Sequence, residues 1–149
     1  MKFEKFLKAV GTHGQIHTRE NNERWLICGG VGMKIPVGVE NLLGSGEVPE
    51  KINTLVEALI KADTDDRVTL TRATISADGK ANDIIRIFGD NLDLEIGITN
   101  ADFGLLEKSD VNLAYVEVEE DILDDLKFLL ILDRSANEVV GFIQGIKEI

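Results

Sequence analysis

Two spacings of apolar residues alternate along the chain, and together they predict a mixture of helices and strands. The first helix is expected over residues 3–10, where four apolar side chains share one face: Phe3, Phe6, Leu7 and Val10. A second helix is expected to begin at Pro49 and to end at residues 63–66, with five apolar side chains on one face: Ile52, Leu55, Val56, Leu59 and Ile60. A single helical turn is predicted from Asn100 to Glu107, because Asn and Asp cap helix starts.

Runs of alternating or β-branched residues predict the strands, which are separated by residues that favour tight turns. Asn21-Asn22 and Asp78-Gly79 are typical of hairpin turns, since Asn and Gly tolerate a positive φ. Residues 67–99 therefore predict an antiparallel meander of three strands. Pro36 lies within another expected strand and places it at a sheet edge or a bulge. The strands are expected over residues 15–19, 24–28, 33–39, 67–77, 83–88, 92–98, 113–119 and 139–146.

Residues 120–133 are ambiguous, because a short apolar run fits either a helix or a buried strand. We favour a helix from about Glu120 that gives way to extended chain. In the strand before it, Ala114, Val116 and Val118 are expected to face inward. The sequence as a whole predicts a single α+β domain over residues 1–149, with mainly antiparallel sheet and two to three helices.

Composition adds that the protein is acidic and that its core is aliphatic. The 149 residues carry a net charge of −11, with +3 on residues 1–34 and −14 on the remainder. Aromatic residues make up only 5%, and Cys28 is the sole cysteine, which favours a reducing compartment and cytoplasmic residence. No apolar run is long enough to span a membrane. A mostly negative field disfavours nucleic acid and anionic membranes as partners, except at a local basic face.

The order of the expected elements and some local motifs resemble a DNA sliding-clamp domain. The residues that carry this resemblance are Glu47-Val48-Pro49 before the second helix, Asn100-Ala101-Asp102-Phe103 after the meander, and Tyr115–Glu119 leading into Ile122–Leu126. The resemblance implies a clamp-like accessory of DNA replication or recombination. Bacterial clamp subunits join three such domains, whereas this chain has the length of one.

A second resemblance is to small acidic proteins of bacteriophage and prophage genomes, carried by the run Trp25-Leu26-Ile27-Cys28-Gly29-Gly30 together with size and charge. It implies no activity, but it favours replication accessories and inhibitors of host defence.

Patterns that could carry catalysis or bind a cofactor are weak. His13, His17 and Cys28 could approach one another on neighbouring strands and bind zinc, but no fourth ligand is identifiable. Gly29–Gly32 lacks the helix start of a phosphate-binding loop, so a bulge or sharp bend is the better interpretation. No nucleophile–base motif is present. We therefore expect no enzymatic activity, no cofactor and no metal.

Two charged sets are candidate interaction residues. Lys2, Lys5 and Lys8 share one flank of the first helix and could face a phosphate backbone. The acidic set could cap a helix or mimic the phosphates of nucleic acid: Glu119, Glu120, Asp121, Asp124 and Asp125.

The leading hypothesis is a non-enzymatic interaction module that forms a homo-oligomer. It is motivated by the absent catalytic motifs and by strands with apolar ends. The alternatives are a clamp-like accessory that binds DNA through the first helix, and an acidic DNA mimic that inhibits a host nuclease.

Overall fold

The computed structural model describes residues 1–39, 48–80, 83–90, 94–119 and 126–146. The helices and strands in these residues are α1 (Phe3–Val10), β1 (Gln15–Thr18), β2 (Arg24–Cys28), β3 (Val31–Lys34), α2 (Glu50–Ile60), β4 (Arg67–Ile75), β5 (Ile84–Gly89), β6 (Glu95–Thr99), α3 (Asn100–Phe103), β7 (Leu113–Val118), β8 (Leu126–Leu132) and β9 (Val139–Gln144). The strands form one antiparallel sheet in the order β1-β2-β3-β9-β8-β7-β4-β5-β6. The predicted α+β class with a mainly antiparallel sheet is confirmed.

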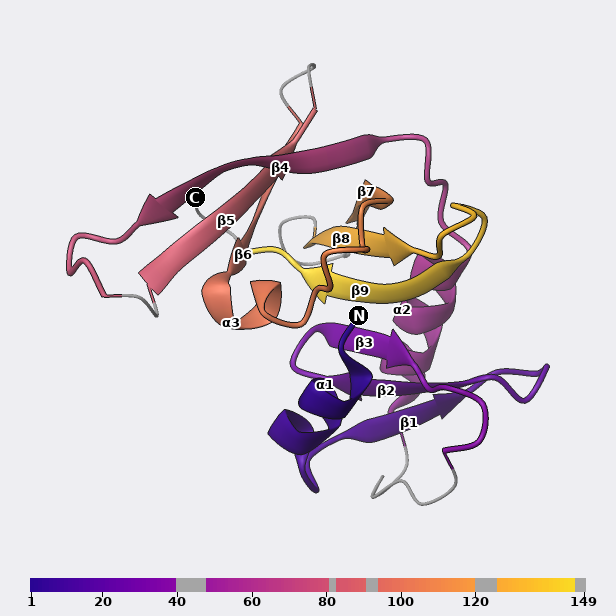
Figure 1. Cartoon of the computed structure of the whole chain (residues 1–149). Coiled ribbons are helices and arrows are strands. Elements are labelled where there is room, and N and C mark those ends of the chain that lie inside the picture. The colour runs from indigo at the N-terminus through magenta and orange to yellow at the C-terminus, as the bar shows by residue number, and fades with distance from the viewer. Residues whose placement is uncertain (40–47, 81–82, 91–93, 120–125, 147–149) are drawn as a thin grey trace.

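The N-terminal and C-terminal parts of the chain meet inside the sheet, where β3 pairs with β9. β3 pairs with β9, which lies more than 100 residues further along the sequence, and Gly32 lies opposite Phe142 in this register. The N-terminal hairpins and the C-terminal strands therefore share one continuous hydrogen-bonded surface (Figure 1).

One face of this surface is covered by α2, as its apolar spacing predicted. Val56 and Leu59 of the helix are buried against a cluster that includes three aromatic rings. Trp25 and Phe142 stack with their centroids 6.0 Å apart, and Phe128 meets Phe142 edge to face at 5.9 Å. Such pairs contribute about 0.5–1.5 kcal/mol each beyond the burial of their surface.

The opposite face is covered by α1 and by the meander β4-β5-β6, which folds back over the sheet (Figure 1). A hydrogen bond holds the meander to the segment that follows β9. The amide of Ile146 donates to the carbonyl of Gly97 in β6 at 2.9 Å. Phe6 and Val10 of α1 share a core with Phe88 and Ile98 of the meander. This second core explains why the helix at residues 3–10 is amphipathic.

The structure corrects the third predicted strand. β3 covers Val31–Lys34 rather than residues 33–39, and it lies inside the sheet between β2 and β9, without a register shift, rather than at an edge or a bulge. The strand begins directly after a two-residue turn in which Gly29 and Gly30 both have positive φ, which confirms the predicted bend in this stretch. It stops before Pro36, which has no N–H for a ladder, and Val37 is fully exposed.

β7 places Ala114, Val116 and Val118 on one side as expected, and β8 shows that the ambiguous run is a strand from residue 126 onward. Ala114 is buried as expected, but Tyr115 on the opposite side of β7 is buried too, because both faces of the sheet are covered here. Residues 126–132 form β8, and all side chains from Phe128 to Leu132 are buried. The helix predicted to begin at about Glu120 falls on residues 120–125, which lie outside the described residues.

A substitution at Gly32 tests the packing where β3 pairs with β9. A Cβ at this position would overlap the ring of Phe142 and approach Ile27 Cδ1 to 2.9 Å. We expect Gly32→Ala to lower the free energy of unfolding by about 1–3 kcal/mol, as overpacked cores do. Urea denaturation measures the change.

Phe142→Leu supplies the control. If the overlap is with the ring, the cost of Gly32→Ala should shrink in a Phe142→Leu background. Equal cost in both backgrounds would contradict this packing.

Candidate functional site

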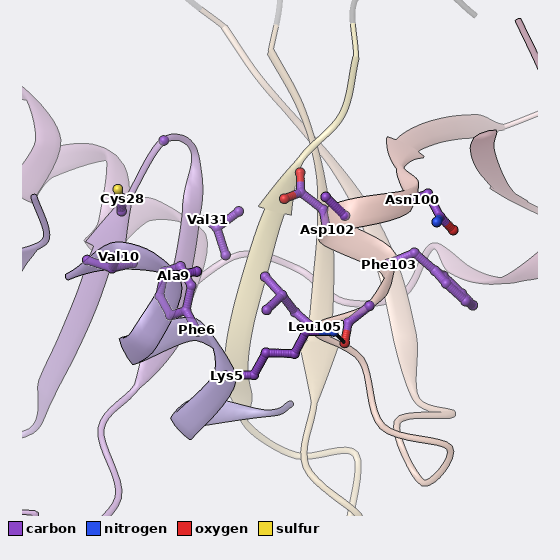
Figure 2. Close-up of a pocket in the computed structure, with 13 residues that line it drawn as sticks. Lys5, Phe6, Ala9, Val10, Cys28, Val31, Asn100, Asp102, Phe103 and Leu105 are labelled. Carbon is purple, nitrogen blue, oxygen red and sulfur yellow. Dashed lines mark hydrogen bonds between the residues drawn. The ribbon is translucent and has the colours of Figure 1, made fainter. Parts of the chain in front are cut away.

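A pocket of about 600 Å³ lies between α1 and α3, on the face of the sheet opposite α2 (Figure 2). Its apolar lining comes from elements far apart in the sequence, including Phe6 and Val10 of α1, Val31 of β3 and Leu105 after α3. The pocket exists because α1 and the α3 segment both pack on the sheet without filling the space between them. Two charged side chains, Lys5 and Asp102, reach its lining.

Asp102 is half-buried in this pocket and lies in the first turn of α3. Its backbone N–H donates to Oγ1 of Thr99, the N-cap of the helix, at 3.2 Å. Burial raises the pKa of the Asp102 carboxyl above its ordinary value, and a hydrogen bond with the Thr99 side chain offsets only part of this effect. The sequence indicated a helix cap here, but not a titratable group inside a pocket.

Lys5 extends across the pocket from α1 and joins the two helical segments. Its Nζ donates to the carbonyl of Gly104 at 3.1 Å (Figure 2). Lys2, directly before α1, and Lys8 on α1 are both exposed. Of the three lysines predicted to share one flank, Lys2 and Lys8 therefore extend into solvent in the described structure, while the ammonium group of Lys5 is hydrogen-bonded to the end of α3.

A second polar cluster links β1 and β2 to α2. His17 is 5% exposed, and its ring nitrogens lie 2.7 Å from Oδ1 of Asn53 and 2.8 Å from Oε2 of Glu57. Arg19 Nε donates to the same Glu57 oxygen at 3.0 Å. Burial acts to raise the pKa of Glu57, but the hydrogen bond with His17 and the charge of Arg19 outweigh it, so that the pKa is lowered.

Glu23 extends this cluster toward the Trp25 ring. It accepts hydrogen bonds from Nε1 of Trp25 at 2.8 Å and from Arg19, and it pairs with Lys34 at 3.2 Å. Burial acts to raise the pKa of Glu23, and these partners together lower it. All the groups have partners, so the cluster holds α2 onto the sheet rather than offering a free reactive group.

The residues of the zinc hypothesis do not come together. His17 is bonded to α2, His13 is exposed, and Cys28 lines the pocket beside α1. The part of the chain that the structure describes contains no group of three His, Cys, Asp or Glu side chains placed to hold a metal ion. Among the same residues, no helix is long and apolar enough to cross a membrane.

Of the acidic set, Glu119 is exposed at the end of β7. The other four members, Glu120, Asp121, Asp124 and Asp125, lie outside the described residues. The DNA-mimic hypothesis therefore stays a prediction.

The outer strand of the β4–β5 hairpin has an open edge in the part of the chain that the structure describes. Within those residues, β4 pairs with β7 only through Arg67 and Val68, whereas its pairing with β5 continues from Thr69 to Ile75. From Thr69 onward every residue of β4 is exposed, including the apolar Leu70 at 46% and Ile75 at 60%. Figure 1 shows this hairpin reaching past the helices that cover the rest of the sheet. Such edges are available to pair with another strand.

Comparison with protein-family models, curated proteins and solved structures found no match for this chain.

Asp102 provides a test of the pocket's electrostatics. Its folded-state pKa is raised, so its ionisation favours unfolding, and the protein loses stability as pH rises from the unfolded-state value near 3.8 through the folded-state pKa. Asn cannot ionise. The stability of Asp102→Asn relative to the unmodified protein should therefore increase with pH across this window, as measured by thermal unfolding. A difference that is constant with pH would contradict the burial of this carboxyl.

Glu57 should show the opposite dependence. Its folded-state pKa is lowered, so its contribution to stability is present above the unfolded-state value near 4.5 and is lost as pH falls through the folded-state pKa. We expect Glu57→Gln to cost about 1–2 kcal/mol near neutral pH and progressively less in acid, the size being limited because the side chain is partly exposed. Glu20→Gln, on an exposed turn, is the matched control. An equal cost of Glu57→Gln at both ends of the pH range would argue against the network.

Proposed function

We propose that this chain is a non-enzymatic protein-interaction module that self-associates through the outer edge of β4. The observation that carries the proposal is the six-residue stretch from Leu70 to Ile75. It pairs on one side with β5, with a register shift between Leu70 and Arg72, and all its residues are exposed. An antiparallel hairpin with an open edge is completed when a second strand supplies the missing hydrogen bonds.

The alternation of hydrogen-bonded pairs between β4 and β5 shows which backbone amides of β4 point toward the open edge. The N–H of Ser76 donates to the carbonyl of Asp83, so these two residues form a hydrogen-bonded pair. Hydrogen-bonded pairs alternate along an antiparallel ladder, and the register continues without a shift from Ile75 back to Arg72. The backbone groups of Ile75 and Ala73 are therefore directed away from β5, toward the open edge.

This phase favours one symmetric arrangement of two copies. With a two-fold axis at Ala73, the backbone groups of Ala73 in the two copies pair with each other, and the small side chains allow close approach. Arg72 then lies opposite Thr74 of the second copy, so the two guanidinium groups do not face each other. The alternative centre at Arg72 would place like charges directly opposite, and it would pair Ala73 with Thr71, which lies at the register shift between Leu70 and Arg72.

Charge also favours the hairpin as the contact region. Residues 67–89 carry four basic and two acidic side chains, a net +2 in a chain of −11. Two copies that meet through acidic surfaces repel each other, whereas contact at the hairpin avoids that repulsion. The pairing of His17 with Asn53 and Glu57 is consistent with a structural role for that cluster, and so with a protein that acts through its surface.

The test is the mass of the protein in solution as its concentration rises, measured by sedimentation velocity. We expect a monomer–dimer equilibrium in the micromolar range. Ala73→Pro should abolish the dimer, because it removes the outward N–H at the centre of the interface while leaving the bonds to β5 intact. Ala73→Val keeps that N–H and should still dimerise.

A monomer at every concentration would refute self-association through β4, and so would an unchanged dimer in Ala73→Pro. Circular dichroism of both variants checks that the sheet is intact.

A further inference from the structure

We propose that the pocket between α1 and α3 is a binding site for a small amine with an apolar body, whose cationic nitrogen pairs with Asp102. This site is separate from the edge of β4 and does not depend on the proposed self-association.

The size and lining of the cavity suit a small organic molecule. Its volume of about 600 Å³ falls within the range of small-molecule sites, roughly 300–1,000 Å³. Phe6, Val31 and Leu105 supply apolar surface against which an alkyl or aryl group would lose contact with water. Such sites combine an apolar lining with a few polar groups that orient the ligand.

Asp102 is the polar group that defines the ligand's charge. Its carboxyl is half-buried in the lining, and among the described residues Thr99 is its only side-chain partner. Burial without a cation disfavours the ionised carboxylate, which is why the pKa of Asp102 is raised. A ligand cation would relieve this penalty through a charge-assisted hydrogen bond.

The protein's own cations near α3 are engaged elsewhere. Nζ of Lys5 donates to the carbonyl of Gly104 at 3.1 Å. Arg86 lies over the Phe103 ring, 4.8 Å from its centroid, and its Nε donates to Asn100 at 3.3 Å. Figure 2 shows the Asp102 carboxylate directed toward the space between the two helices, while Lys5 reaches toward Gly104. The carboxylate of Asp102, rather than the ammonium group of Lys5, therefore determines the charge of the ligand that the pocket favours.

The experiment is an NMR titration of the full chain with n-hexylamine, using n-hexanol and hexanoate as ligands of matched length. We expect hexylamine to shift the amide signals of Gly29, Asp102 and Gly104, which line the pocket, and to bind at least about tenfold more tightly than hexanol. Hexanoate should bind more weakly than either.

Two variants and a control localise the binding. Asp102→Asn should weaken hexylamine binding by about tenfold or more and remove the preference for the amine over hexanol. Ala9→Phe, at an exposed position on the rim of the pocket, should block all three ligands. Glu107→Gln removes an exposed carboxylate outside the pocket and should bind hexylamine normally.

The proposal is overturned if hexylamine does not bind, if hexanoate binds as tightly, or if Asp102→Asn retains full affinity. Binding that Glu107→Gln weakens as much as Asp102→Asn does would also overturn it, since it would reflect general attraction to an acidic surface. Chemical-shift spectra of the free variants confirm that each is folded.

Discussion

The pairing of β3 with β9 is the constraint on which the rest of the structure depends. It joins Val31, Gly32 and Met33 to Ile143, Phe142 and Gly141, and so makes one sheet from the two ends of the chain. Gly32 permits the join, because the Phe142 ring occupies the space that a side chain at position 32 would need. Held there, Phe142 contacts both Trp25 from the N-terminal part and Phe128 from the C-terminal part. Without this pairing, neither half would bury both of its faces.

Each candidate surface follows from that joined sheet. α2 covers one face through aromatic packing and the His17–Glu57–Arg19 cluster, whose polar side chains are hydrogen-bonded to one another. On the other face, α1 comes from the N-terminal part of the chain, and α3 comes from the part that follows β6. The pocket lies between these two helices (Figure 2). The meander is anchored at β6 through Gly97, and among the described residues the far end of β4 pairs only with β5. The joined sheet thus positions both the pocket between α1 and α3 and the open edge of β4.

The sequence predicted what local spacing controls. The helical periodicity at residues 3–10 and 52–60 located α1 and α2, and Asp78-Gly79 located the turn after β4, where Gly79 has positive φ. It misplaced β3, since the alternation of Met33, Ile35 and Val37 does not reveal that Val37 is exposed while Gly32 is central. Contacts between residues far apart in the sequence form the pocket. Lys5 was a candidate because of its charge, but only the packing of α3 places Asp102 in the same pocket. The exposure of β4 on both faces has a partial signal in its Thr, Arg and Ala content, which lacks alternation.

Residue-resolved amide hydrogen exchange tests the joined sheet most directly. If the β3–β9 pairing holds the two ends in one cooperative unit, the amides within Val31–Met33 and Gly141–Ile143 exchange only through global unfolding, with the same free energy as β8. The opposite result is an opening of β1–β3 as a separate unit at lower free energy while β7–β9 stay protected. That result would contradict a single sheet as the basis of both the pocket and the open edge.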